Sequence, residues 1–156
     1  MNQAIVLRPA VIEDAPAIRE LTRDAYAKWI PVIGREPKPM TADYDEAVRQ
    51  HQIELLYVDD ELAALIETIP ETDHILIENI AVSPRFQRRG LGRHLLAHVE
   101  QVAKSLGYGQ IRLYTNKLFA ENVRLYLRLG YRVDREEEFK NGIAVHMRKS
   151  LSSDNG

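Results

Sequence analysis

The sequence predicts a single α/β (α+β) domain. Its 156 residues are the length of one domain, and short strand-like segments alternate with longer segments of helical periodicity. Seven segments have the pattern of strands, and four have the pattern of helices. We expect strands at residues 4–8, 54–58, 62–68, 74–82, 111–115, 131–134 and 143–148, and helices at 13–29, 44–50, 91–106 and 119–129. The domain is expected at residues 1–150, followed by a flexible tail at 151–156.

Turn and cap signals divide the first half of the chain. Pro9 ends the first strand, and acidic residues followed by Pro16 mark the start of the first helix. Thr41 or Asp43 can cap the second helix, because both side chains can accept a backbone N–H. The polar residues 59–61 separate two strand patterns, which is the signal of a hairpin.

Similar signals divide the second half. Asn116 can cap the last helix, and Gly130 ends it. Asn141 and Gly142 predict the turn that joins the last two strands.

Composition and charge exclude several classes of protein. Hydrophobic residues make up 45% of the chain and charged residues 28%, which is normal for a globular domain. The formal net charge of -2 argues against nucleic acid as the main partner. No apolar run is long enough to span a bilayer, and the N-terminal residues lack the pattern of a secretory signal. We therefore expect a cytoplasmic protein without a membrane partner.

The absence of cysteine limits the chemistry. Disulfides and zinc–thiolate sites are excluded, and an acyl-cysteine intermediate cannot form. The five histidines have no third metal ligand in a recognisable spacing, so we expect no metal.

The most informative segment runs from residue 77 to residue 107. A short apolar strand ends at Pro84, because proline cannot donate to a β-ladder. A basic turn with two glycines follows, and then an amphipathic helix that ends at Gly107. The inner face of that helix consists of Leu91, Leu95, Leu96, Val99, Val102, Ala103 and Leu106.

The glycine turn is expected to bind a phosphate or pyrophosphate. The first turn of a helix has backbone N–H groups without partners, and its dipole favours negative charge. Glycine allows a phosphate to approach the backbone closely. Four arginines surround the turn, namely Arg85, Arg88, Arg89 and Arg93. The dinucleotide pattern is incomplete, because Leu95 stands where its third glycine would be, and the Gly-Lys-Ser/Thr ending of a phosphate loop is absent.

What is present is Gln-x-x-Gly-x-Gly at residues 87–92, directly after a strand that ends in Ala-Val-Ser-Pro. This pattern resembles the GNAT superfamily of acetyl-CoA-dependent N-acetyltransferases. A second pattern, Asn122 and Tyr126 followed by Gly130-Tyr131, is similar to the end of a GNAT domain. The resemblance covers most of the chain. It implies a GNAT-like fold, with a central mixed, mostly antiparallel seven-stranded sheet flanked by about four helices, and acetyl-CoA as co-substrate.

The resemblance also implies the residues that bind CoA. In the family the turn binds the pyrophosphate, and the preceding strand pairs with the pantetheine arm and offers N–H groups to the oxyanion. The corresponding residues are Ile80, Ala81, Val82, Gln87, Arg88, Arg89, Gly90, Leu91 and Gly92. Many members have an asparagine seven residues before the tyrosine, where this chain has Phe119. Either Asn116 or Asn122 therefore contacts CoA, and we prefer Asn122 because it lies one helical turn before Tyr126.

Two residues are catalytic candidates. Glu78 shares a face of its strand with Ile80 and Val82, so it interrupts an apolar face and is expected to be partly buried, as suits a general base. The acceptor amine must lose a proton before it attacks, and Glu78 or a relay of water molecules can take it. The resemblance makes Tyr126 the residue that protonates or hydrogen-bonds the CoA sulfur.

The segment at 30–40 is expected to be a loop with three prolines. In the resembling family the corresponding segment shapes the acceptor site, which makes Tyr26, Trp29, Arg35 and Met40 substrate candidates. The alternative is a surface loop whose aromatic residues pack on the core.

These patterns predict an N-acetyltransferase that moves an acetyl group from acetyl-CoA to a primary amine by direct transfer in a ternary complex. A small molecule or a protein could supply the amine, and a homodimer is open. The alternative is a non-catalytic CoA-binding sensor or scaffold, which would need the glycine turn but neither Glu78 nor Tyr126. A nucleotide-binding module is less favoured, because no acidic residue stands at 106–110 to contact a ribose.

Overall fold

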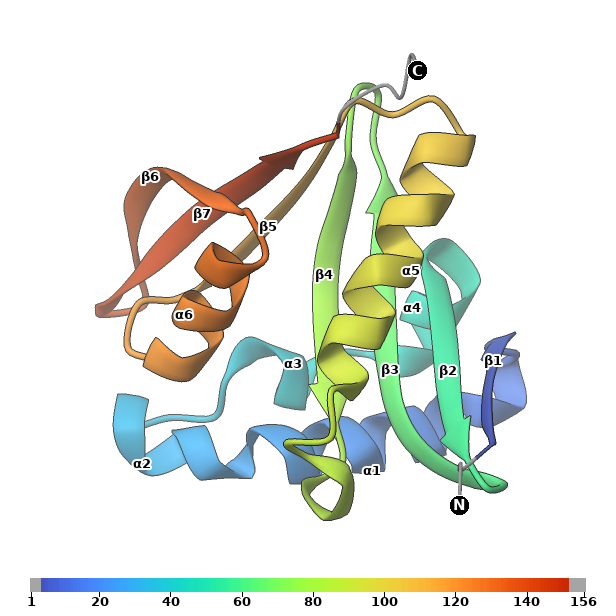
Figure 1. The fold of residues 1–156 in the computed structure, drawn as a ribbon. Helices are drawn as coiled ribbons and strands as arrows, with labels where there is room; N and C mark the ends of the chain where they lie inside the picture. Colours follow the sequence, from blue (N-terminus) through green and yellow to red (C-terminus); the bar gives the residue numbers. More distant parts are fainter. Residues whose placement is uncertain (1–3, 152–156) are drawn as a thin grey trace. The chain divides into compact units, whose positions relative to one another are not determined.

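The computed structural model describes residues 4–151 (Figure 1). Most of the expected tail at 151–156 lies outside the described residues. Its first residue, Leu151, is described, and its N–H donates to the Gly109 carbonyl at 2.9 Å.

The seven expected strands form one mixed sheet with the order β1-β2-β3-β4-β5-β7-β6. Pairing is antiparallel between β1 and β2, β2 and β3, β5 and β7, and β6 and β7, and parallel between β4 and β5. The prediction of a mixed, mostly antiparallel sheet is therefore confirmed. The strands are β1 (Ile5–Pro9), β2 (Gln52–Val58), β3 (Glu61–Pro70), β4 (Ile75–Val82), β5 (Gln110–Asn116), β6 (Arg132–Phe139) and β7 (Gly142–Ser150).

The four expected helices are present as α1 (Ala15–Tyr26), α4 (Tyr44–Gln50), α5 (Leu91–Ser105) and α6 (Ala120–Arg128). The prediction of a loop at residues 30–40 was wrong in detail, because two single-turn helices form there, α2 (Ile30–Ile33) and α3 (Lys38–Thr41). A proline stands in the first turn of each. Proline is tolerated at that position because the N–H it lacks would have no helical partner. Three short 3-10 helices are also present among the described residues, namely η1 (Ile12–Asp14), η2 (Ala27–Trp29) and η3 (Pro84–Phe86).

Two expected caps had different outcomes. Asp43 caps α4, since its carboxylate accepts the Glu46 N–H at 3.2 Å. Asn116 does not cap α6, because it ends β5 and its Oδ1 accepts the N–H of Leu118 at 2.9 Å. The helix begins only at Ala120, so the side chain of Asn116 stabilises the turn before the helix instead.

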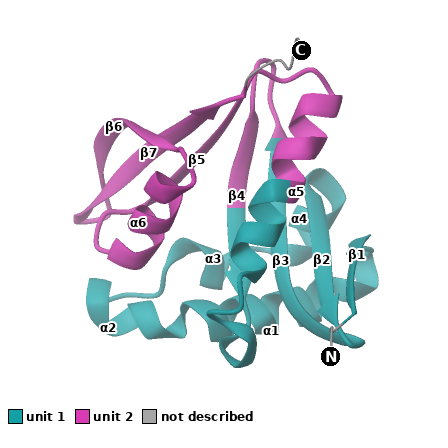
Figure 2. Cartoon of the chain, in the orientation of Figure 1, with its two compact units in different colours: residues 1–69, 79–97 teal, residues 70–78, 98–156 magenta. Residues whose placement is uncertain are grey.

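The chain divides into two compact units (Figure 2). Unit 1 comprises the residues up to Ile69 together with Asn79–Ala97, and unit 2 comprises Pro70–Glu78 together with the residues from His98 onward. The boundary therefore passes through β4 and through α5. The assignment of residues 1–150 to one domain stays a prediction.

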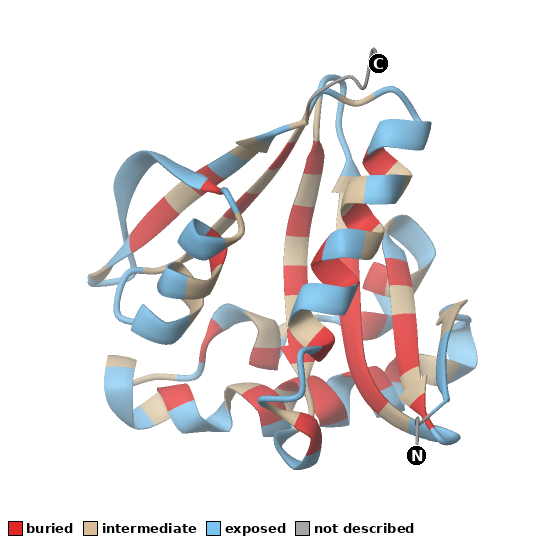
Figure 3. Cartoon of the chain, viewed as in Figure 1, coloured by how far each residue is buried: buried red, intermediate tan, exposed pale blue. Residues whose placement is uncertain are grey.

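The core of unit 1 lies between α1, α4 and the sheet. Helix α1 contributes residues at steps of three and four, which is the pattern of one buried face. Its contacts with α4, β2, β3 and β4 bury Ala15, Ile18, Leu21, Ala25, Tyr44, Ala47, Ile53, Leu55, Leu65 and Ala81. Along β4 buried and half-buried residues alternate strictly (Figure 3). This alternation confirms that 77, 79 and 81 share one face, while 78, 80 and 82 share the other.

In unit 2, β6 and β7 form a hairpin at the end of the sheet. The turn predicted at Asn141-Gly142 is displaced by one residue. Lys140 and Asn141 adopt left-handed conformations, with φ of 47° and 62°, as a two-residue hairpin turn requires. Gly142 pairs with Phe139 and begins β7. All eight residues of β6 are exposed.

Candidate active site

The turn between β4 and α5 has the backbone that the glycine pattern predicts. Arg88 and Gly90 lie in the left-handed region, with φ of 66° and 80°. A Cβ atom added at Gly90 or at Gly92 would meet no heavy atom within 4 Å beyond its chain neighbours and helical backbone. Because L-residues disfavour this backbone, glycine is the favoured residue at position 90. The backbone at the start of α5 is also open to an approaching group.

Exposed arginines surround this turn. Arg85 forms an ion pair with Glu61 and lies 5.8 Å from the centroid of the Phe86 ring. Arg89 lies over the same ring at 5.2 Å. Within residues 4–151, Arg88 and Arg93 have no ion pair with an acidic side chain, so their charge is available to a bound anion.

The last residues of β4 present their backbone groups to two different edges. The Ser83 N–H donates to the Ala63 carbonyl of β3 at 2.8 Å. Successive N–H groups of an extended strand point to opposite edges. The N–H groups of Ile80 and Val82 therefore face away from β3, and that of Ala81 faces toward it. Of the three predicted backbone donors, Ile80 and Val82 share the edge away from β3, and Ala81 does not.

Side chains engage the carbonyl groups on that edge. The Tyr26 hydroxyl donates to the Ile80 carbonyl at 3.1 Å, and Gln87 Nε2 donates to the Val82 carbonyl at 3.0 Å. Gln87 Oε1 accepts a hydrogen bond from Lys28 Nζ at 3.4 Å. The side chain of Gln87 thus joins the glycine turn to the strand before it. Its role in this structure is to hold the turn in place.

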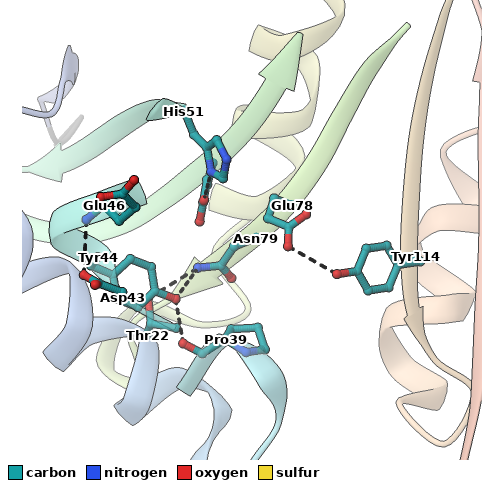
Figure 4. Close-up of polar contacts among 10 residues, drawn as sticks. Thr22, Pro39, Asp43, Tyr44, Glu46, His51, Glu78, Asn79 and Tyr114 are labelled. Atoms are coloured by element: carbon teal, nitrogen blue, oxygen red, sulfur yellow. Dashed lines mark hydrogen bonds and ion pairs between the residues drawn. The ribbon is translucent and has the colours of Figure 1, made fainter. Parts of the chain in front are cut away.

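A buried polar network in unit 1 was not anticipated from the sequence (Figure 4). Asn79 is 4% exposed, and its Oδ1 lies 3.0 Å from the Tyr26 hydroxyl oxygen, whose single proton is shared between Asn79 and the Ile80 carbonyl. Its Nδ2 donates to the Tyr44 hydroxyl at 3.2 Å and approaches the Thr22 hydroxyl at 3.5 Å. Tyr44 donates in turn to the Pro39 carbonyl at 2.6 Å. An asparagine on the apolar face of β4 was the available signal, because a buried amide requires partners.

The predicted substrate residues occupy different environments. Tyr26 belongs to the network on β4. Trp29 and Met40 are buried, and the Met40 carbonyl accepts a hydrogen bond from Arg23 at 2.8 Å. Arg35 is half-buried and donates to the Glu36 carbonyl at 3.3 Å. Of the four, Tyr26 contacts the end of β4 through its hydroxyl.

Glu78 is half-buried on β4, as its position on the strand predicted. Its Oε1 accepts a hydrogen bond from the Tyr114 hydroxyl of β5 at 3.2 Å (Figure 4). Tyr114 was not among the predicted site residues. Tyr114 lies on β5, the strand that follows α5. It is the residue after Leu113, which pairs with Ile77, the residue before Glu78.

Tyr126 lies on α6 and is 6% exposed. Burial raises the pKa of its hydroxyl to about 12, because a phenolate would be poorly solvated there. The group is therefore a neutral hydrogen-bond donor at physiological pH. Asn122, half-buried one turn earlier, is free of the backbone contact that engages Asn116. Which of the two contacts CoA stays a prediction.

The ring of Tyr131 packs edge-on against Tyr126, with centroids 5.8 Å apart. Burial also raises the pKa of Tyr131, chiefly by desolvation. Its hydroxyl is buried and has no hydrogen-bond partner among the described residues.

Among residues 4–151, no three histidine or acidic side chains form a group that could hold a metal ion. His51 instead contacts the buried carboxylate of Glu67 at 2.5 Å, with Nδ1 facing Oε2. Within the same residues, no helix combines the length and the hydropathy needed to cross a bilayer.

Comparison with known proteins agrees with this geometry. The model of the "Acetyltransferase (GNAT) family" matches residues 15–131. The chain belongs to the GNAT acetyltransferase family. This membership confirms the resemblance that the glycine turn and the tyrosine helix predicted.

Two relatives show how far the sequence similarity extends. The alanine N-acetyltransferase of ribosomal protein bS18 from Salmonella typhimurium is 40% identical over 76 residues, which cover 49% of this chain and 51% of that protein. The match thus spans about half the length of that relative. The uncharacterized N-acetyltransferase YvbK of Bacillus subtilis is 30% identical over 113 residues, covering 64% of this chain and 72% of YvbK.

A solved structure supports the fold. The PaiA N-acetyltransferase of Thermoplasma acidophilum, crystallised in complex with coenzyme A, has a TM-score of 0.76 at 18% identity. The similarity covers 94% of this chain and 99% of that one. It confirms that the sheet and helices have the GNAT arrangement.

Proposed function

We propose that this protein is an N-acetyltransferase that moves the acetyl group of acetyl-CoA to a primary amine. The observation that carries the proposal is the turn between β4 and α5, where a left-handed glycine opens onto the start of a helix among exposed arginines. Membership of the GNAT family supports it, and so does the coenzyme A bound to the PaiA relative. The absence of cysteine excludes an acyl-cysteine intermediate but leaves other nucleophiles open, and the mechanism proposed is direct attack of the amine on the thioester in a ternary complex.

The glycine turn is assigned to the pyrophosphate of CoA. The backbone N–H groups at Gly90–Gly92 would donate to it, and the helix dipole of α5 favours the negative charge. Arg88 and Arg93 add charge without first breaking an ion pair. Gln87 acts indirectly, by holding the turn against the Val82 carbonyl.

The reaction forms a C–N bond and breaks the C–S bond of the thioester. The amine proton passes to Glu78, directly or through water, so that the nitrogen lone pair can attack. The N–H groups of Ile80 and Val82 donate to the thioester oxygen while negative charge develops on it. As the tetrahedral intermediate collapses, the nitrogen loses its second proton to solvent and the pair of electrons from the C–S bond leaves with the CoA thiolate.

Tyr126 is assigned to the departing sulfur. A thiol has a pKa of about 8.5, whereas that of Tyr126 is about 12. Complete transfer of its proton to the thiolate would therefore cost roughly 5 kcal/mol, at about 1.4 kcal/mol per pKa unit. Tyr126 thus acts by donating a hydrogen bond, and the thiolate takes its proton from solvent after release.

The acceptor is a small-molecule amine or a protein amine. A peptide with an N-terminal alanine is the first candidate, because the Salmonella relative is named for acetylating alanine of a ribosomal protein. A polyamine, an amino-sugar and a free amino acid complete the set of chemical classes to compare.

Calorimetric titration tests the cofactor assignment. Acetyl-CoA should bind to the purified protein and NADH should not, since the turn lacks the third glycine of a dinucleotide site. Failure of a folded protein to bind acetyl-CoA would contradict the proposal.

Detection of the released thiol tests the reaction. Thiol should appear only when acetyl-CoA and a suitable amine are both present, and Tyr126→Phe should lower kcat more than it weakens acetyl-CoA binding. Acetyl-CoA binding without thiol release on any of the four acceptor classes would instead favour a CoA-binding sensor or scaffold.

A further inference from the structure

The region around Glu78 contains a contact that the proposed mechanism does not use. Within unit 2, β4 and β5 pair from Ile75 and Ile111 to Ile77 and Leu113. Glu78 and Tyr114 are the next residues of the two strands. Their side chains are joined by the hydrogen bond of 3.2 Å in which the phenol donates to the carboxylate.

This bond restricts the conformations of the Glu78 side chain. A glutamate has several rotatable bonds, and ordering them costs conformational entropy. A neutral phenol can donate to the ionised carboxylate, and a hydrogen bond to a charged group is stronger than one between neutral groups. Tyr114 therefore favours one orientation of the Glu78 carboxylate.

The structure also supports Tyr114 from the opposite side. Tyr114 is paired in register with His146 of β7, and their rings lie 5.7 Å apart at an angle of 34°. His146 Nε2 is 3.1 Å from Glu137 Oε1 on β6. Tyr114 on β5 thus contacts His146 on β7, which in turn contacts Glu137 on β6.

We propose that Tyr114 is a positioning residue that orients the Glu78 carboxylate for proton acceptance. The inference rests on the proposed function, because it requires Glu78 to be the base. It adds a residue outside the glycine turn and the tyrosine helix that define the family resemblance.

The test is a double-mutant cycle on acetyl transfer. Tyr114→Phe removes the donor and keeps the ring that contacts His146. It should lower kcat roughly tenfold, as expected for the loss of a hydrogen bond to a charged group, while the KM for acetyl-CoA changes less than about twofold. Tyr108→Phe, which removes a phenol from another partly buried tyrosine, is the matched control and should keep the wild-type rate.

The decisive comparison is made in the Glu78→Gln background. If Tyr114 acts through Glu78, adding Tyr114→Phe to Glu78→Gln should cause no further loss of kcat. If the two losses multiply, Tyr114 has an independent structural role and the inference is overturned.

A second variant changes Glu78, the acceptor of the same hydrogen bond. Glu78→Asp shortens the carboxylate by one methylene, so it should lower kcat and also become insensitive to Tyr114→Phe. Wild-type kcat in Tyr114→Phe would overturn the inference while leaving the acetyltransferase assignment intact. A wild-type protein that releases no thiol would overturn the proposed function, and the inference with it.

Discussion

Replacing Tyr126 with phenylalanine should change the alkaline stability of the protein over a defined pH range. Burial raises the pKa of Tyr126 to about 12 in the folded protein, and the unfolded chain has the ordinary value of about 10. Between these values the unfolded state gives up its proton first. The free energy of unfolding therefore falls as pH rises through this range.

The size of the effect follows from the two pKa values. A difference of about two pKa units, at about 1.36 kcal/mol each, corresponds to roughly 2.7 kcal/mol. This stabilisation is fully present below about pH 10 and is lost as pH approaches about 12. Phenylalanine does not titrate, so the free energy difference between wild type and Tyr126→Phe should decrease by roughly 2–3 kcal/mol across the range.

Urea unfolding of both proteins at a series of pH values measures this difference. Ultraviolet absorbance of the tyrosinate provides a second measurement, since Tyr126 and Tyr131 should both titrate late in wild type and the contribution of Tyr126 should be missing from the variant. Tyr108→Phe, at a partly exposed position, controls for the general effect of alkali. If the wild-type and Tyr126→Phe stabilities ran parallel through the range, the phenol would be solvated and the assignment of a buried donor would fail.

Two further predictions concern stability without ligand. Gly90→Ala should destabilise the protein by about 1–2 kcal/mol, because alanine disfavours the left-handed backbone at φ of 80°. Gly92→Ala, within α5, should leave stability unchanged or slightly higher. Equal urea midpoints for the two variants would contradict this prediction. Tyr131→Phe should preserve or raise Tm, because it deletes a buried hydroxyl that has no partner among the described residues. A Tm several degrees lower would mean that this hydroxyl is hydrogen-bonded.

Much of the fold follows from local sequence. The alternation along β4 predicts a strand and the spacing after Gly90 predicts a helix, because side-chain direction has a period of two in a strand and 3.6 in a helix. The glycine turn was noticed for a different reason, because glycine allows a phosphate to approach the backbone closely. The segment at 30–40 was harder, because a proline in a first turn permits a short helix as readily as it ends one.

The contacts that define the site were not predictable in the same way. Tyr114 and Glu78 lie 36 residues apart, and Tyr26 and Asn79 lie 53 apart. No local pattern encodes which residues of two strands become neighbours, because register is set by the packing of the whole sheet. Glu78 stood out as a polar residue in an apolar strand, but only the structure identifies its partner Tyr114.

The exposed strand β6 has a consequence for solubility. It is the last strand in the sheet order, so one of its edges has no neighbouring strand within the described sheet. Such an edge can pair with the same edge of another molecule and start aggregation. Here six of the eight residues are charged, in the sequence Arg-Val-Asp-Arg-Glu-Glu-Glu-Phe. A second molecule that extended the sheet would have to bring its own charged strand alongside this one, so the charges of β6 keep the open edge from acting as a template.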